Sequence, residues 1–134
     1  MRHKALAVVN GLFALLHLNV AWIAAGIAIL GWLSHPGSGA LGLALLLAIL
    51  AGTLLVATLG VLHARLAYRL LNGGRSPGLQ RALALVYVIG CPIGAIWAAP
   101  GMWDGAAVVA ALYLGFFTCG LVYGLVALWT VLRP

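Results

Sequence analysis

Four apolar segments, each about twenty residues or longer, occupy most of the sequence, at residues 5–33, 40–64, 82–100 and 106–131. A run of about 20 apolar residues has the length of a helix that crosses the hydrocarbon core of a bilayer. Only 6% of the residues are charged and 66% are hydrophobic, so the polar side chains are too few to cover a water-soluble domain. The pattern predicts an all-α membrane protein with four transmembrane helices.

Turn signals between these segments set the predicted helix ends. His-Pro-Gly at 35–37 closes the first helix, Asn-Gly-Gly-Arg-Ser-Pro-Gly at 72–78 joins the second to the third, and Pro-Gly at 100–101 closes the third. Glycine suits a helix C-terminus, and serine followed by proline suits an N-terminus. We predict a single four-helix transmembrane domain over residues 1–134, with helices at about 5–33, 40–71, 77–100 and 106–132.

The basic residues fall on one side of this threading. Arg2 and Lys4 precede the first helix, Arg133 follows the fourth, and the connection between the second and third is flanked by Arg65, Arg69, Arg75 and Arg81. The other two connections contain no lysine or arginine, and the second of them holds the only acidic residue, Asp104. The positive-inside rule then predicts an up-down bundle with both termini in the cytoplasm, N-in/C-in.

This distribution also accounts for the net charge of +6 without a nucleic-acid partner. The richness in alanine, glycine and leucine favours a bacterial inner membrane as the location. On the cytoplasmic face, we expect anionic lipid headgroups to be contacted by Arg65, Arg69, Arg75 and Arg81.

Two polar residues near the middle of the first helix, His17 and Asn19, point in nearly opposite directions, because two residues correspond to about 200° around a helix. His17 shares its stripe with the small residues Ala14 and Ala21, which favour close helix contact. Asn19 lies among leucines and isoleucines, on the side expected to face lipid. Its amide then bonds to another protein chain, to a local backbone carbonyl or to water. The first alternative predicts a partner interface at Asn19.

Small residues mark further contact faces. Gly120 and Gly124 have the GxxxG spacing and are predicted to belong to the partner interface, with other membrane subunits or with copies of the chain. Gly90, Pro92 and Gly94 predict a kink in the third helix, because proline cannot donate a backbone hydrogen bond there.

His17 and His63 are the candidate cofactor ligands, since neutral imidazole binds haem iron and related centres. By rise per residue, His17 lies about 18 Å inside the cytoplasmic end of its helix, whereas His63 is two residues from Arg65. The resulting gap of roughly 6–15 Å disfavours haem b shared by both. Haem or chlorophyll on His17 alone stays open beside a plain buried histidine that bonds a backbone carbonyl. No cofactor is predicted outright.

No metal site is expected, because Cys91 and Cys119 form no CxxC or Cys/His zinc spacing. The lack of an intramembrane carboxylate disfavours an ion-coupled transporter and an enzyme. The sequence therefore favours a non-catalytic accessory or scaffolding subunit of a larger membrane complex. The alternatives are a tetrapyrrole-binding subunit of an electron-transfer or photosynthetic complex that uses His17, and a small dimeric transporter.

Overall fold

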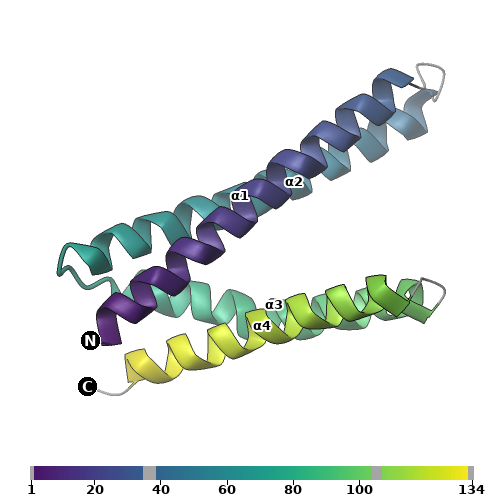
Figure 1. Ribbon diagram of the computed structural model, residues 1–134. Helices are drawn as coiled ribbons and strands as arrows, with labels where there is room; N and C mark the ends of the chain where they lie inside the picture. Colours follow the sequence, from purple (N-terminus) through teal and green to yellow (C-terminus); the bar gives the residue numbers. More distant parts are fainter. Residues whose placement is uncertain (1, 35–38, 104–106, 133–134) are drawn as a thin grey trace. The chain divides into compact units, whose positions relative to one another are not determined.

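A computed structural model describes the backbone of residues 2–34, 39–103 and 107–132, and the side chains of residues 4–34, 39–96 and 114–132. This part of the chain is helical, as predicted, and comprises α1 (Arg2–Ser34), α2 (Gly39–Leu71), α3 (Pro77–Trp103) and α4 (Ala107–Leu132) (Figure 1). All four helices are long and apolar enough to cross a membrane. The class of fold, a helical multi-pass membrane protein, follows from length and composition.

The helices form two compact units, Met1–Arg75 and Ser76–Pro134. In each unit two consecutive helices pack against each other, α1 with α2 and α3 with α4, as a helical hairpin (Figure 1). The helices of the first hairpin are antiparallel, because residue 10 meets residue 63 and residue 14 approaches residue 60.

The turn between α2 and α3 explains why one helix stops and the next begins. Gly73 has a positive φ of 74°, which glycine adopts without strain. Its N–H donates to the Leu70 carbonyl at 3.4 Å, and the Gly74 N–H donates to the Arg69 carbonyl at 2.8 Å. This pair of bonds is the Schellman arrangement that ends a helix. Pro77 then occupies the first position of α3, where its missing N–H costs nothing.

In the first hairpin, the small-residue face predicted for α1 is buried and includes Ala14, His17 and Ala21. The opposite face is exposed, as predicted, and carries Leu12, Leu16, Asn19, Ile23, Ile27 and Leu30. Gly60 of α2 packs so closely on α1 that an added Cβ would lie 2.9 Å from Leu18 Cγ and 3.3 Å from the Ala14 carbonyl. Small side chains therefore set the approach of these two helices.

Glycines do the same in the second hairpin. A Cβ on Gly120 would lie 2.6 Å from Cys91 Sγ, and one on Gly124 would lie 3.0 Å from the Ala84 carbonyl. The side of these glycines on which a Cβ would lie faces α3 of the same hairpin, so they set the approach of α3 and α4, and their role in a partner interface stays a prediction. Gly94 is also covered, by Phe117, and α3 continues as a helix through Pro92.

Gly124→Ala tests this packing, because the new methyl group meets a backbone carbonyl that cannot turn aside. We expect the free energy of unfolding to fall by about 1–3 kcal/mol, the usual cost of overpacking. Gly115 lies on the same helix with nothing within 4 Å of its added Cβ, so Gly115→Ala is the matched control and should not destabilise. Reversible unfolding in mixed micelles, followed by circular dichroism, measures both. Equal stabilities for the two variants would contradict the packing described here.

Candidate functional site

The buried polar residues of the first hairpin gather in one place. Asn10, Phe13 and His17 lie on one face of α1, at spacings of three and four residues, and His63 faces them from α2. We call these four residues the histidine cluster. Asn10 and His63 are 0% exposed and His17 is 4% exposed, which makes this cluster the most deeply buried polar group of the hairpin.

Hydrogen bonds fix the side chains of the histidine cluster. The Asn10 amide donates from Nδ2 to the Leu6 carbonyl at 2.8 Å, so its Oδ1 is the acceptor for His63 Nδ1–H, also at 2.8 Å. His17 Nδ1–H donates to the Phe13 carbonyl at 2.6 Å. A carbonyl oxygen can only accept, so Nδ1 is the donor in both histidines; in the neutral tautomer that makes this bond, the unprotonated ring nitrogen is Nε2.

The rings of the histidine cluster are in mutual contact. The centroids of His17 and His63 lie 5.5 Å apart with 28° between the ring planes, and the Phe13 ring lies 6.0 Å from His17 and 5.4 Å from His63. The two rings are closer than the predicted difference in depth suggests. The register places His63 opposite Asn10, seven residues before His17, or about 10 Å along the helix, within the predicted gap. The rings nevertheless meet, because side chains lean toward the N-terminus of their own helix and the two helices are antiparallel.

The second hairpin has a polar crossing of its own, which the sequence analysis missed. Gln80 of α3 donates from Nε2 to the Ala127 carbonyl at 3.1 Å and to Thr130 Oγ1 at 2.7 Å. Thr130 in turn donates to the Ala127 carbonyl at 2.8 Å. The one available signal was a lone glutamine at the start of an apolar helix, whose partners lie 47 and 50 residues away in sequence.

Further along the second hairpin, Tyr87 of α3 and Tyr123 of α4 form an edge-to-face ring pair with centroids 5.2 Å apart. Both rings are buried. Cys91 is buried beside Gly120, whereas Cys119 is exposed, and both are free thiols.

Asn19 lies where the sequence predicts, on the exposed face of α1. Its Nδ2 donates to the Leu15 carbonyl one turn earlier at 2.8 Å. Of the three partners considered for this amide, the local backbone carbonyl is thus present. Within the described part of the chain, this is the hydrogen bond that the Asn19 side chain makes, and it uses one of its two N–H groups.

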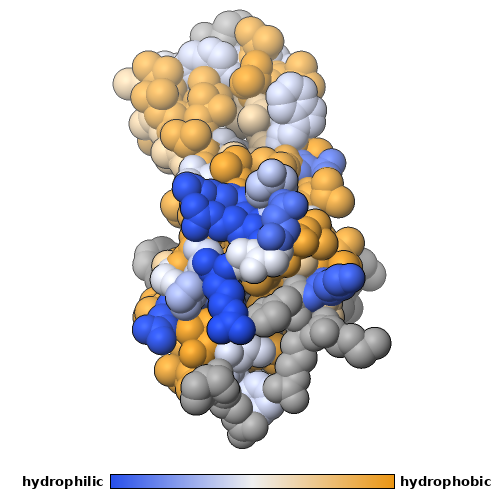
Figure 2. Space-filling view, turned by 90° about the vertical axis from the view of Figure 1, so that its left-hand side faces the viewer, coloured by the Kyte–Doolittle hydropathy of each residue, from blue (hydrophilic) through white to orange (hydrophobic). Residues whose placement is uncertain are grey.

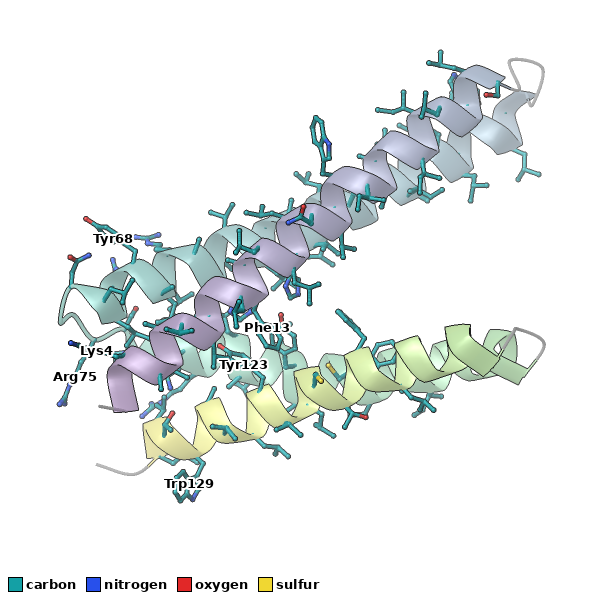
Figure 3. The ribbon with its side chains drawn as sticks, in the orientation of Figure 1. Lys4, Phe13, Tyr68, Arg75, Tyr123 and Trp129 are labelled. Atoms are coloured by element: carbon teal, nitrogen blue, oxygen red, sulfur yellow. The ribbon has the colours of Figure 1, made fainter. Side chains whose placement is uncertain are left out.

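The basic residues are exposed at the ends of the helices. In the first hairpin, Lys4, Arg65, Arg69 and Arg75 lie toward the end where the chain leaves α2, and Figure 3 labels Lys4 and Arg75 there. Arg81 is exposed in the second turn of α3. Hydrophilic side chains are visible among the apolar ones on the surface viewed in Figure 2. The side chains of Arg2, Asp104 and Arg133 lie outside the described residues.

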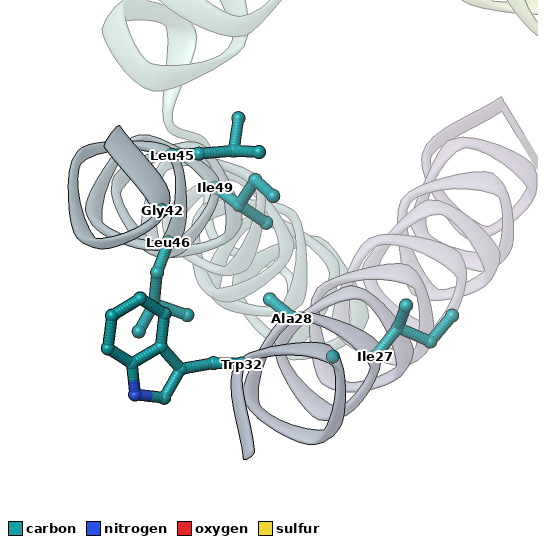
Figure 4. Close-up of a pocket in the computed structure, with 8 residues that line it drawn as sticks. Ile27, Ala28, Trp32, Gly42, Leu45, Leu46 and Ile49 are labelled. Atoms are coloured by element: carbon teal, nitrogen blue, oxygen red, sulfur yellow. The ribbon is translucent and has the colours of Figure 1, made fainter. Parts of the chain in front are cut away.

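An apolar cavity of about 290 Å³ opens between α1 and α2 near their connected ends (Figure 4). The indole N–H of Trp32 is the single polar group on its lining side chains, which are Ile27, Ala28, Trp32, Leu45, Leu46 and Ile49, with Gly31 and Gly42. A lining of this kind suits hydrocarbon and offers no group for chemistry.

Comparison of the chain with protein-family models, with curated proteins and with solved structures finds no match. Among the residues that the structure describes, three or more His, Cys, Asp or Glu side chains nowhere converge as a metal centre would require. Arguments about function therefore depend on the two hairpins themselves.

Asn10→Ala tests the hydrogen bond within the histidine cluster. Removal of the amide leaves His63 Nδ1–H without its acceptor inside the hairpin, and we expect a loss of about 1–3 kcal/mol in the free energy of unfolding. Asn72→Ala is the control, because Asn72 is exposed and bonds its own helix at the Tyr68 carbonyl, and it should change stability by less than about 0.5 kcal/mol.

A double-mutant cycle with His63→Leu then isolates the pair. Asn10→Ala should cost less when His63 is already absent, since the two residues share one hydrogen bond. If the losses of the two single variants simply add in the double variant, the Asn10–His63 hydrogen bond contributes nothing to stability.

Proposed function

We propose that the chain is a non-catalytic accessory or scaffolding subunit, which packs against other membrane proteins, or copies of itself, within a larger membrane complex. The observation that carries the proposal is Asn19, a polar side chain on the apolar, outward face of α1.

The chemistry of the amide explains why it favours a neighbour. Asn19 has two N–H groups and one carbonyl oxygen, and the bond to Leu15 uses one N–H. Hydrocarbon offers no partner for the rest, and burying an amide without partners is unfavourable. A polar group on an adjacent transmembrane helix would supply them, which is a recurrent way in which membrane helices associate.

The exposed surface around Asn19 suits such a contact. Leu16 is 45% exposed, Ile23 is 58% exposed and Trp22 is 82% exposed. A neighbouring helix would cover this surface by close packing and would enclose the amide. The surface also suits lipid, so the polar group at its centre is what favours a protein partner over lipid alone.

The proposed location is the bacterial inner membrane, with both termini in the cytoplasm. Its support is the placement of all seven lysine and arginine residues at one set of helix ends. On that face, anionic lipid headgroups would pair with the exposed Arg65, Arg69, Arg75 and Arg81.

Asn19→Leu should weaken association, because it removes the outward amide and leaves a side chain of similar size that suits lipid. Thr58→Val is the matched control, since Thr58 is an exposed polar residue of α2 that also bonds its own helix, at the Leu54 carbonyl. Native mass spectrometry from mild detergent measures the complexes that survive. We expect a lower-mass species for Asn19→Leu and an unchanged mass for Thr58→Val. A wild-type chain that is monomeric and free of copurifying proteins would contradict the subunit role.

Labelling tests the proposed orientation. In a chain with Cys91→Ala and Cys119→Ala, Arg75→Cys should react with a membrane-impermeant maleimide only after the inner membrane is opened. Ser34→Cys, at the other end of the first hairpin, should react in intact spheroplasts. Reaction of Arg75→Cys from the periplasmic side would overturn the orientation and the lipid contact with it.

A second candidate is a tetrapyrrole-binding subunit. The observation that favours it is the contact of His17 Nδ1 with the Phe13 carbonyl, because Nδ1 is then the donor and Nε2 is the ring nitrogen of the kind that binds haem or chlorophyll. The contact of His17 with Phe13 and His63 means that a macrocycle has to displace those rings. A visible absorption band in the mildly purified protein decides this alternative.

A further inference from the structure

The face of α1 that points away from α2 carries a regular apolar spacing with Asn19 inside it. Steps of four and three residues alternate along this face, which is the spacing of a left-handed coiled coil. We call the residues at these steps the Asn19 seam; they are Leu12, Leu16, Asn19, Ile23, Gly26, Leu30 and Leu33. The residues that pack on α2, such as Ala14 and His17, lie on the opposite side of the helix.

The Asn19 seam has room for a second helix. Its leucines and its isoleucine are between 45% and 66% exposed. A Cβ added to Gly26 would have nothing within 4 Å, so a neighbouring helix has space to approach α1 closely there. A partner with the same spacing would interdigitate its side chains with those of the seam.

Asn19 differs from Thr58 of α2 in what its local hydrogen bond leaves over. The Thr58 hydroxyl gives its single proton to the Leu54 carbonyl. Asn19 donates one N–H to the Leu15 carbonyl at 2.8 Å, and its amide retains a second N–H and a carbonyl oxygen. The fitting partner therefore both donates and accepts, and an identical amide does so.

We propose that the partner on the Asn19 seam is a second copy of this chain, in a parallel pair of α1 helices whose Asn19 amides bond each other; this rests on the proposed subunit function and names its partner. Every copy has the same charge distribution and crosses the membrane in the same direction, so α1 meets α1 in parallel. A two-fold axis along the membrane normal then brings residue 19 of both copies to one depth. The N–H left on one amide donates to Oδ1 of the other, as a buried asparagine in a coiled-coil core fixes the register of its pair.

A second copy meets all the requirements of the seam together. It brings the same spacing, a glycine opposite Gly26, and an amide at the depth of Asn19. Lipid covers the apolar side chains equally well, but its hydrocarbon gives the amide no partner.

Cysteine cross-linking in native membranes tests the contact. In a chain with Cys91→Ala and Cys119→Ala, Ile23→Cys places a thiol on the seam about one turn from Asn19 and leaves the amide intact. Because equivalent residues lie close to a two-fold axis, oxidation should produce a covalent dimer.

Leu54→Cys in the same background is the matched control. The hydrogen bond between Asn10 and His63 sets the register of the hairpin and places residue 54 level with Asn19. Leu54 is exposed, but it lies on α2, away from the seam, and should give no dimer. Equal cross-linking of Ile23→Cys and Leu54→Cys would overturn the proposed contact.

Energy transfer between two populations of the purified chain, labelled with donor and acceptor dyes in lipid vesicles, measures self-association without any other protein. Asn19→Leu should weaken it by about 3- to 30-fold, which corresponds to a hydrogen bond between membrane helices. Asn19→Gln keeps an N–H and a carbonyl oxygen and should retain most of the association, and Thr58→Val should not change it. Equal weakening by Asn19→Gln and Asn19→Leu would refute the amide pair.

Two further outcomes separate this proposal from the subunit role. A chain that is monomeric in vesicles, but copurifies with a different membrane protein from native membranes, would refute the second copy and leave the subunit role standing. A chain that is monomeric and copurifies with no protein would contradict both.

Discussion

In the interior of a membrane, a polar group has no water to bond, and this constraint explains where the polar side chains of the chain are found. The buried amides all have partners: Asn10 links a carbonyl of its own helix to His63, and Gln80 reaches the carbonyl of Ala127 and the hydroxyl of Thr130. Exposed polar residues such as Thr58 and Asn72 bond the carbonyl four residues earlier. The hydrogen bonds between helices therefore specify the register of each hairpin. The bonds within one helix lower the free-energy cost of placing a single polar side chain on its surface.

Close approach of the backbones is what allows these short bridges. Gly60, Gly120 and Gly124 leave room for the facing helix, so that an asparagine or glutamine side chain is long enough to cross. In lipid, where apolar surfaces gain little by meeting each other, this close packing supplies much of the attraction between helices. The recurrence of small residues, an amide and a ring pair in both hairpins indicates one structural solution used twice along the chain.

The sequence predicts those features that depend on local pattern. Hydropathy identifies the four helices, the 3.6-residue period identifies the buried face of α1, and Gly-Gly followed by Ser-Pro identifies the turn after α2. It fails where the answer depends on how far two helices slide past each other. The contact between the His17 and His63 rings is one example, because their depths along the helices differ and the lean of the side chains in an antiparallel pair brings the rings together. For the same reason, the partners of Gln80 and the neighbours of Gly120 could not be read from spacing.

The two hairpins pack different ring pairs at corresponding buried positions. The imidazoles of His17 and His63 are nearly parallel, with 28° between their planes, whereas the rings of Tyr87 and Tyr123 meet edge to face, at 76°. Imidazole is smaller and more polar than phenol, and a pair of them requires Asn10 and a backbone carbonyl as acceptors to be accommodated. The histidine pair is therefore tied to the hydrogen bonds that fix the register of the first hairpin, whereas Gln80 and Thr130 supply the polar contact between the helices of the second.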